Sequence, residues 1–246
     1  MPYFENGGRL IYFAHVPKAA GTSVERYLEA RFGPLALRDG GWAEAWSRGG
    51  APGASLRNSP QHVTADDASR LMPRAPDWCF AVVRDPVARV VSEFRMHRRS
   101  RRRRSGLTRA GFSPWLSLVL AAARRDPTVF DNHMRPQTDL VPAEAEVFRL
   151  EDGLAPLIDR IDAVTGTTAP GLEIGHHLAA RDDPQPEPCK GDLRRIAAAF
   201  AQDYERFGYP EPAPGEGNTC ALATLAASAA PALAPSVVRR YRQGLL

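Results

Sequence analysis

One lysine of this sequence lies in a short segment, residues 15–23 (HVPKAAGTS), between two predicted secondary-structure elements. The apolar residues 9–14 before the segment predict a buried strand. Apolar residues at helical spacing follow it, and Thr22 with Glu25 matches a capping box, so we predict a helix that begins at Thr22. The unpaired N–H groups and the dipole at such a helix start attract phosphate. The segment is therefore predicted to be a phosphate-binding loop that contains Lys18.

The composition supports a specific role for Lys18. Lys18 and Lys190 are the only lysines among 32 Lys and Arg residues, so all other residues of this pair of types are arginine. An ammonium group is a compact point charge that a planar guanidinium does not reproduce. The alternative is an ordinary exposed lysine in a strand–helix turn. The segment also differs from a Walker A loop, in which the lysine directly follows the last glycine.

A second strand–helix unit follows along the chain. Residues 78–83 form a continuous apolar run, which predicts a strand buried on both faces. Asp85 as N-cap and Pro86 as the first helical residue predict the start of the next helix. Arg84 then stands at the carboxyl end of the strand, where open α/β sheets bind their ligands, and its forked donors suit a phosphate.

These two units resemble the donor-binding motifs of sulfotransferases that use 3′-phosphoadenosine 5′-phosphosulfate. The first unit carries Pro-Lys-x-x-Gly-Thr-Ser, and the second carries Arg-Asp-Pro-x-x-Arg-x-x-Ser, which ends at Ser92. The chain resembles a bacterial form of the carbohydrate, Golgi-type sulfotransferase family 2. Within the second motif, Arg89 either contacts the donor or forms an ion pair with Asp85. The resemblance covers roughly residues 9–210.

The resemblance implies an α/β fold, a P-loop-NTPase-like three-layer sandwich with a central parallel sheet flanked by helices. It also implies in-line attack of an acceptor hydroxyl on the sulfur of the donor, without a metal. Lys18 would stabilise charge on the leaving phosphate, and Arg84 and Ser92 would hold the 3′-phosphate. The residues that would hold the 5′-phosphate are Lys18, Ala20, Gly21, Thr22 and Ser23.

Two histidines are candidates for the general base, because a neutral imidazole suits that role near neutral pH. His62 lies between the two donor motifs, just before a short helix that Thr64 and Asp67 are predicted to cap. It matches a His-Val element whose histidine is the base in glycosaminoglycan uronyl 2-O-sulfotransferases. The alternative is a structural or exposed histidine. His133, in the His-x-x-Pro-Gln element of related carbohydrate sulfotransferases, is the rival base or acceptor-binding residue.

The remaining pattern extends the same domain. We predict a helix over 112–125, a third strand over 145–150 followed by a helix through Ile161, and one long helical stripe over 193–207. We also predict a loop over 33–60 with a short helix at 41–47, and exposed His176 and His177. The sulfotransferase domain is predicted to cover residues 1–210. An Ala/Pro-rich extension would follow over 211–246, with a linker to 235 and a basic helix at 236–243.

Composition places the chain among ordinary globular proteins. Its 246 residues are 43% hydrophobic and 24% charged, and no apolar run approaches the length of a membrane span. The N-terminus lacks the pattern of a signal peptide. Cys79, Cys189 and Cys220 are widely spaced and odd in number, which favours neither a disulfide framework nor a zinc site. We therefore expect a cytoplasmic protein.

The net charge of +4 comes from one run, residues 95–104, which holds seven arginines. The run is either a solvated helix end, an attractor for an anionic donor or acceptor, or a peripheral membrane contact. We expect a hydroxyl-bearing acceptor, a carbohydrate or glycolipid, and no nucleic acid, because no aromatic platform accompanies the run.

Two other classes of function compete with this interpretation. A nucleoside or sugar kinase would also bind phosphates after a strand, but it would show the Walker A order and a carboxylate for magnesium. A basic nucleic-acid or polyanion-binding module would rest on the arginine run alone, and its binding would depend steeply on salt and not on Lys18.

Overall fold

The structure is a computed structural model that describes residues 2–37, 57–99, 111–175, 185–213 and 218–243. The chain forms two compact units, each built from two segments. The first comprises Met1–Arg84 and Gln137–Ala179, and the second comprises Asp85–Pro136 and Ala180–Leu246.

A four-stranded sheet is the centre of the first unit. The strands are β1 (Tyr3–Asn6), β2 (Arg9–Ala14), β3 (Trp78–Val83) and β4 (Glu146–Arg149), in the spatial order β1-β2-β3-β4. β1 and β2 are antiparallel, whereas β2–β3 and β3–β4 are parallel. The predictions of strands over 9–14, 78–83 and 145–150 are confirmed, and the fold is a mixed α/β fold with a mostly parallel sheet.

The antiparallel edge strand β1 was not predicted. It joins β2 through the two-residue turn Gly7–Gly8, and both glycines have positive φ, 57° and 78°. These dihedrals match the hairpin turns that follow the twist of the strands, and they favour glycine. The Asn6-Gly7-Gly8 sequence is thus the signal that indicates this hairpin.

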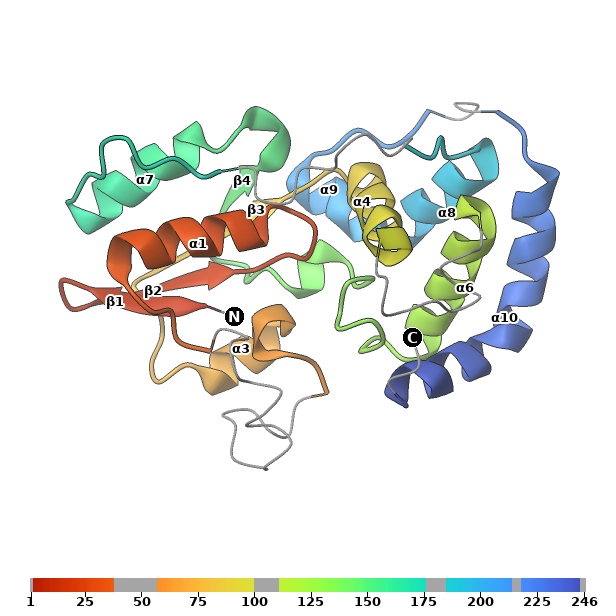
Figure 1. Ribbon diagram of the computed structural model, residues 1–246, viewed down its shortest axis with the longest axis horizontal. Coiled ribbons are helices and arrows are strands. Elements are labelled where there is room, and N and C mark those ends of the chain that lie inside the picture. The colour runs from red at the N-terminus through yellow and green to blue at the C-terminus, as the bar shows by residue number, and fades with distance from the viewer. Residues whose placement is uncertain (1, 38–56, 100–110, 176–184, 214–217, 244–246) are drawn as a thin grey trace. The chain divides into compact units, whose positions relative to one another are not determined.

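Helices flank the sheet (Figure 1). α1 (Gly21–Phe32) and α7 (Ala155–Thr165) pack on it through a shared apolar core, and α3 (Ala65–Leu71) lies on the opposite side of the β1–β2 pair from α1. α7 ends one turn beyond the predicted Ile161. The described residues of this unit also include the 3₁₀ helices η1 (Pro60–His62), η2 (Gln137–Asp139) and η3 (Leu150–Asp152). The core contains Phe4, Ile11, Phe13, Val24, Tyr27, Leu28, Leu35, Phe80, Val82, Leu157, Ile161 and Ile174.

The parallel pairing of β2 and β3 brings the residues that follow these two strands to the same edge of the sheet. Ala14 at the end of β2 pairs with Ala81 near the end of β3, so both strands finish at one edge of the sheet. The loop with Lys18 follows β2, and Arg84 follows β3. Two segments that are far apart in sequence therefore meet at the carboxyl edge, where open α/β sheets bind ligands.

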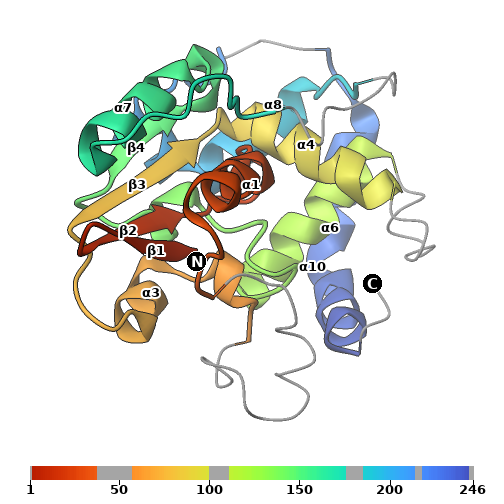
Figure 2. The same cartoon turned by 60° about the vertical axis from the view of Figure 1, so that its left-hand side comes forward.

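The second unit consists of helices in the residues that the structure describes. They are α4 (Pro86–Arg99), α6 (Phe112–Arg125), α8 (Lys190–Ala199), α9 (Ala201–Phe207) and α10 (Ala221–Arg242). α10 lies along α6 in both views (Figures 1 and 2), with Ala230 and Ala234 against Ala121. Arg242 also forms an ion pair of 2.6 Å with Asp126 at the end of α6. The helix predicted over 112–125 is confirmed.

Two predictions for the C-terminal part are wrong. The stripe over 193–207 is two helices, because the backbone of Phe200 (φ −122°, ψ 27°) leaves the helical conformation between α8 and α9. The linker predicted to reach residue 235 is helical from Ala221, although Pro231 and Pro235 lie inside the helix. Alanine has the highest helix propensity, and small side chains allow close packing on α6, which outweighs the two prolines.

Several other expectations concern parts that lie outside the described residues. These are the short helix at 41–47, His176 and His177, and Arg101–Arg104 of the arginine run. Cys79, Cys189 and Cys220 form no disulfide bond in the part of the chain that the structure describes. Among the described residues, no helix combines the length and apolarity needed to cross a bilayer.

Candidate active site

The loop between β2 and α1 has an unusual backbone. Lys18 (φ 69°) and Ala20 (φ 63°) both adopt the left-handed conformation, which side chains other than glycine rarely do. Each such residue costs about 1–2 kcal/mol relative to ordinary backbone. Strain of this kind persists where surrounding contacts hold the chain, and it concentrates at binding sites.

The predicted capping box at the start of α1 is wrong. The helix begins at Gly21, its N-cap is Ala20, and no side chain caps it. The N–H groups of Ser23 and Val24 point back to the carbonyl oxygen of Ala20, at 2.9 Å and 3.1 Å. Glu25, the expected capping partner, hydrogen-bonds elsewhere. A helix start without a side-chain cap leaves its first N–H groups for another acceptor, which is what an anion site requires.

The Glu25 carboxylate is instead the centre of a buried network. Nδ1 of His15 lies 2.6 Å from Oε1 of Glu25, and Nε2 of Gln61 donates to both carboxylate oxygens at 3.0 Å and 2.9 Å. Glu25 is only 1% exposed and His15 only 7%. The ring of His15 also lies against Gly21, where a Cβ atom would collide with it. Gly21 is therefore required for close approach.

The left-handed backbone predicts opposite effects for two neighbouring alanines. Ala20→Gly should raise the free energy of unfolding by about 1 kcal/mol, because glycine adopts positive φ without strain. Ala19 lacks positive φ and is fully buried, so Ala19→Gly should lower the free energy of unfolding by a similar amount. Chemical denaturation of both variants measures the difference. A lower stability for Ala20→Gly would contradict the loop conformation described above.

Arg84 is fixed at the end of β3 and reaches the same loop. Its Nη1 donates to the carbonyl oxygen of Lys18 at 3.2 Å. Its backbone is held by the Gln137 side chain, which accepts from the Arg84 N–H at 2.9 Å and donates to the Arg84 carbonyl at 2.8 Å. Gln137 is fully buried. Arg84 was expected here from the sequence, whereas the role of Gln137 was not, although its Pro-Gln pair is visible in the sequence.

His62 ends η1, next to Gln61. The short helix after it is confirmed: α3 has Thr64 as its N-cap, and the Thr64 side chain accepts from the N–H of Asp67 at 3.2 Å. Nδ1 of His62 lies 3.5 Å from Oγ of Ser59, which is a long contact. The ring stands edge-on to the ring of His15, with centroids 4.8 Å apart. His62 thus adjoins the network that supports the loop between β2 and α1.

The second unit carries the start of α4 and the rival histidine. Asp85 caps α4 as predicted, since its Oδ1 accepts from the N–H of Ala88 at 2.7 Å. Ser92 is half-buried on this helix. The alternative that Arg89 pairs with Asp85 is not what the structure shows. The Arg89 guanidinium donates instead to the carbonyl oxygens of His133 at 3.0 Å and Arg135 at 2.6 Å.

Arg89 is therefore a buried support for the loop after α6. It is 1% exposed and lies over the ring of Phe200. Burial lowers the pKa of its guanidinium from the ordinary value, while the negative charges of Asp203 and Glu93 act in the opposite direction. Since arginine begins from so high a pKa, the side chain remains charged near neutral pH.

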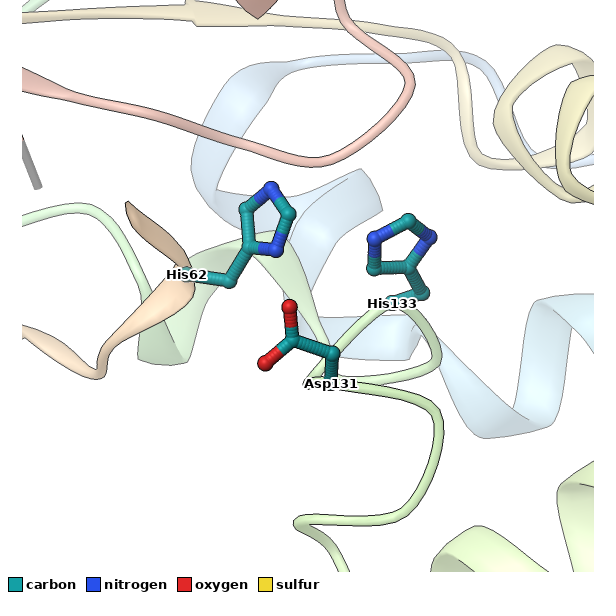
Figure 3. A group of neighbouring side chains, drawn as sticks. All are labelled: His62, Asp131 and His133. Atoms are coloured by element: carbon teal, nitrogen blue, oxygen red, sulfur yellow. The ribbon is translucent and has the colours of Figure 1, made fainter. Parts of the chain in front are cut away.

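His133 is oriented by a carboxylate. Its Nδ1 lies 2.7 Å from Oε2 of Glu93, a buried side chain of α4, and the other carboxylate oxygen faces Nδ1 of His97 at 3.5 Å. Such a carboxylate fixes the tautomer and leaves the Nε2 atom of His133 for other partners. Figure 3 shows His62 of the first unit, and Asp131 and His133, which project from one loop of the second unit. Phe130, Asp131 and Asn132 in this loop all have positive φ.

The candidate side chains were visible in the sequence, but the residues that hold them were not. Glu25, Gln61, Glu93 and Gln137 are ordinary polar residues in the sequence, and only the fold brings them to their partners.

Comparison with known proteins gives one match. Residues 2–168, about two thirds of the chain, match the model described as "Sulfotransferase family", and this span contains both predicted donor motifs and both candidate histidines. Neither the curated proteins nor the solved structures contain a significant match. With a family model covering more than half of its length, the chain belongs to the sulfotransferase family.

Proposed function

We propose that the protein transfers a sulfuryl group from 3′-phosphoadenosine 5′-phosphosulfate to a hydroxyl of a carbohydrate or glycolipid. The observation that supports this most is the carboxyl edge of β2 and β3. There the uncapped start of α1, the Lys18 loop and the Arg84 guanidinium lie within one unit, and Arg84 contacts the Lys18 backbone at 3.2 Å. Adjacent cationic and N–H donors suit a ligand that carries two phosphate groups.

The loop and the first turn of α1 are proposed to hold the 5′-phosphate. The backbone N–H groups of Ala20, Gly21 and Thr22 and the side chain of Ser23 would donate to its oxygens, in a helix start that no side chain caps. Lys18 would neutralise the charge that develops on the leaving phosphate as the bond to sulfur breaks. Sulfuryl transfer is similar to phosphoryl transfer in its loose transition state, so positioning and charge stabilisation dominate.

Arg84 and Ser92 are proposed to hold the 3′-phosphate, on the basis of the motif that they share. A general base then accepts the proton of the acceptor hydroxyl. His62 is our first candidate because it adjoins the donor loop, and His133 is the second because Glu93 orients it. Neither role requires a metal ion in this proposal.

The proposal extends to architecture and context. We propose a P-loop-NTPase-like three-layer arrangement, a catalytic domain over residues 1–210 with 211–246 as an extension, and a cytoplasmic location. The exposed Arg98 and Arg99 at the end of α4 belong to the arginine run, which would attract an anionic acceptor or a membrane surface. No nucleic-acid partner is proposed.

Nucleotide binding separates this proposal from a kinase. Adenosine 3′,5′-bisphosphate, the by-product of transfer, should raise the melting temperature more than ATP with magnesium does. At 100 times its dissociation constant a ligand adds about 2.7 kcal/mol, which corresponds to about 5–10 °C for a chain of this size. A thermal shift assay with and without magnesium measures both. An equal shift with ATP, or a shift that disappears without magnesium, would favour the kinase.

A further inference from the structure

We propose that Glu25 is a positioning residue that locks the phosphate-binding loop and the His62 segment into one rigid element. The inference rests on the proposed function, because it assigns these two segments to donor binding and proton transfer. It starts from the location of the three residues in the buried network. His15 ends the strand side of the loop, Glu25 lies on the helix side, and Gln61 directly precedes His62.

The first step concerns the two ends of the loop. A bond between Nδ1 of His15 and the Glu25 carboxylate bridges residues 16–24, which include both left-handed residues. At 2.6 Å from a carboxylate oxygen, Nδ1 carries the proton and donates it, so the Nε2 side of the ring faces Gly21. The ring therefore fills the space beneath the start of α1, and the carboxylate holds the ring in place.

The second step concerns the His62 segment. Gln61 donates to both oxygens of the same carboxylate, at 3.0 Å and 2.9 Å, and the His62 ring contacts the His15 ring. One buried carboxylate thus connects β2, α1 and η1. Because residues with strained backbone stay in place only where their surroundings hold them, loss of this carboxylate should loosen the loop and η1 together.

The sign of the effect on binding distinguishes positioning from simple electrostatics. A negative charge beneath an anion site repels the anion, so neutralising Glu25 should tighten nucleotide binding if charge alone matters. If Glu25 positions the loop, the isosteric Glu25→Gln should instead weaken binding of adenosine 3′,5′-bisphosphate by about 10-fold. Glu29→Gln, the same change one turn later on α1, should leave the affinity unaltered. Isothermal titration calorimetry measures all three proteins.

An experiment without nucleotide tests the same rigid element independently of the proposed function. In hydrogen–deuterium exchange of the ligand-free chain, Glu25→Gln should raise amide exchange both in residues 16–24 and in 59–63, whereas Glu29→Gln should raise it in neither. If only one segment responds, or neither does, the proposed lock is wrong. If both respond but the wild type does not bind the nucleotide, the proposed function fails while the lock stands.

A double-mutant cycle tests the connection to His62. Gln61→Leu keeps volume but removes the amide, so it should slow release of inorganic sulfate from the donor, with water as acceptor, by about 10-fold. The affinity for adenosine 3′,5′-bisphosphate should change by less than about two-fold, and in a His62→Ala background Gln61→Leu should have no further effect. Additive losses would overturn the connection. An unchanged rate for His62→Ala alone would instead refute His62 as base.

Discussion

Replacement of Lys18 by alanine is expected to slow sulfuryl transfer by about 10²–10³-fold. Negative charge on the leaving phosphate grows as the bond to sulfur breaks, so the ammonium stabilises the transition state more than the bound donor. The affinity for adenosine 3′,5′-bisphosphate should therefore fall much less than the turnover. Steady-state kinetics with the donor, together with calorimetry of the bisphosphate, gives both quantities for each variant.

Three further substitutions sharpen this prediction. Lys18→Arg should also be slow, because a planar guanidinium does not replace a compact charge on a left-handed residue. Lys190→Ala, at the only other lysine, which begins α8, should keep full activity. Arg84→Ala should mainly weaken donor binding, since the 3′-phosphate does not react. Full activity of Lys18→Arg would show that the role assigned to Lys18 is wrong.

Removal of the general base should have an effect of similar size. His62→Ala is expected to transfer sulfate at least about 100-fold more slowly while it binds adenosine 3′,5′-bisphosphate normally. The physical reason is that the acceptor hydroxyl must lose its proton as it attacks, and the bisphosphate contains no such group. Turnover at saturating donor and calorimetry with the bisphosphate are the two measurements.

The same pair of measurements on His133→Ala separates the two candidates. His133 has the orientation expected of a base, since Glu93 holds its Nδ1 at 2.7 Å, whereas His62 has a long contact to Ser59. If His133→Ala abolishes transfer and His62→Ala stays within a few-fold of the wild type, the base is His133. Two small effects would exclude both assignments.

The sequence predicted the strands and the edge of the sheet where the candidate site lies. Residues 9–14 and 78–83 are apolar runs between turn signals, and buried parallel strands require such runs. The motif residues at their carboxyl ends then had to meet once the two strands paired. Local patterns of this kind depend only on neighbours in the chain, which is why the loop with Lys18 and the position of Arg84 could be predicted.

What could not be predicted depends on contacts between distant residues. Glu25 matches a local capping box, yet its carboxylate binds His15 and Gln61, so the helix starts one residue earlier without a cap. Arg89 follows Asp85 by one helical turn, which favours an ion pair between them, but its guanidinium instead supports the loop of His133 and Arg135. In both cases the buried charged side chain bonds to groups that only the tertiary structure brings near it, because burial of a charge without a partner costs free energy.

The most direct test of the account is transfer itself. The chain is incubated with 3′-phosphoadenosine 5′-phosphosulfate and a panel of glycans and glycolipids, and the products are analysed by mass spectrometry that resolves sulfation from phosphorylation. We predict that at least one acceptor gains an SO₃ group, that the gain requires the donor but not magnesium, and that Lys18→Ala nearly abolishes it. A phosphorylated product formed from ATP and magnesium, with no sulfated product from any acceptor, would contradict the account.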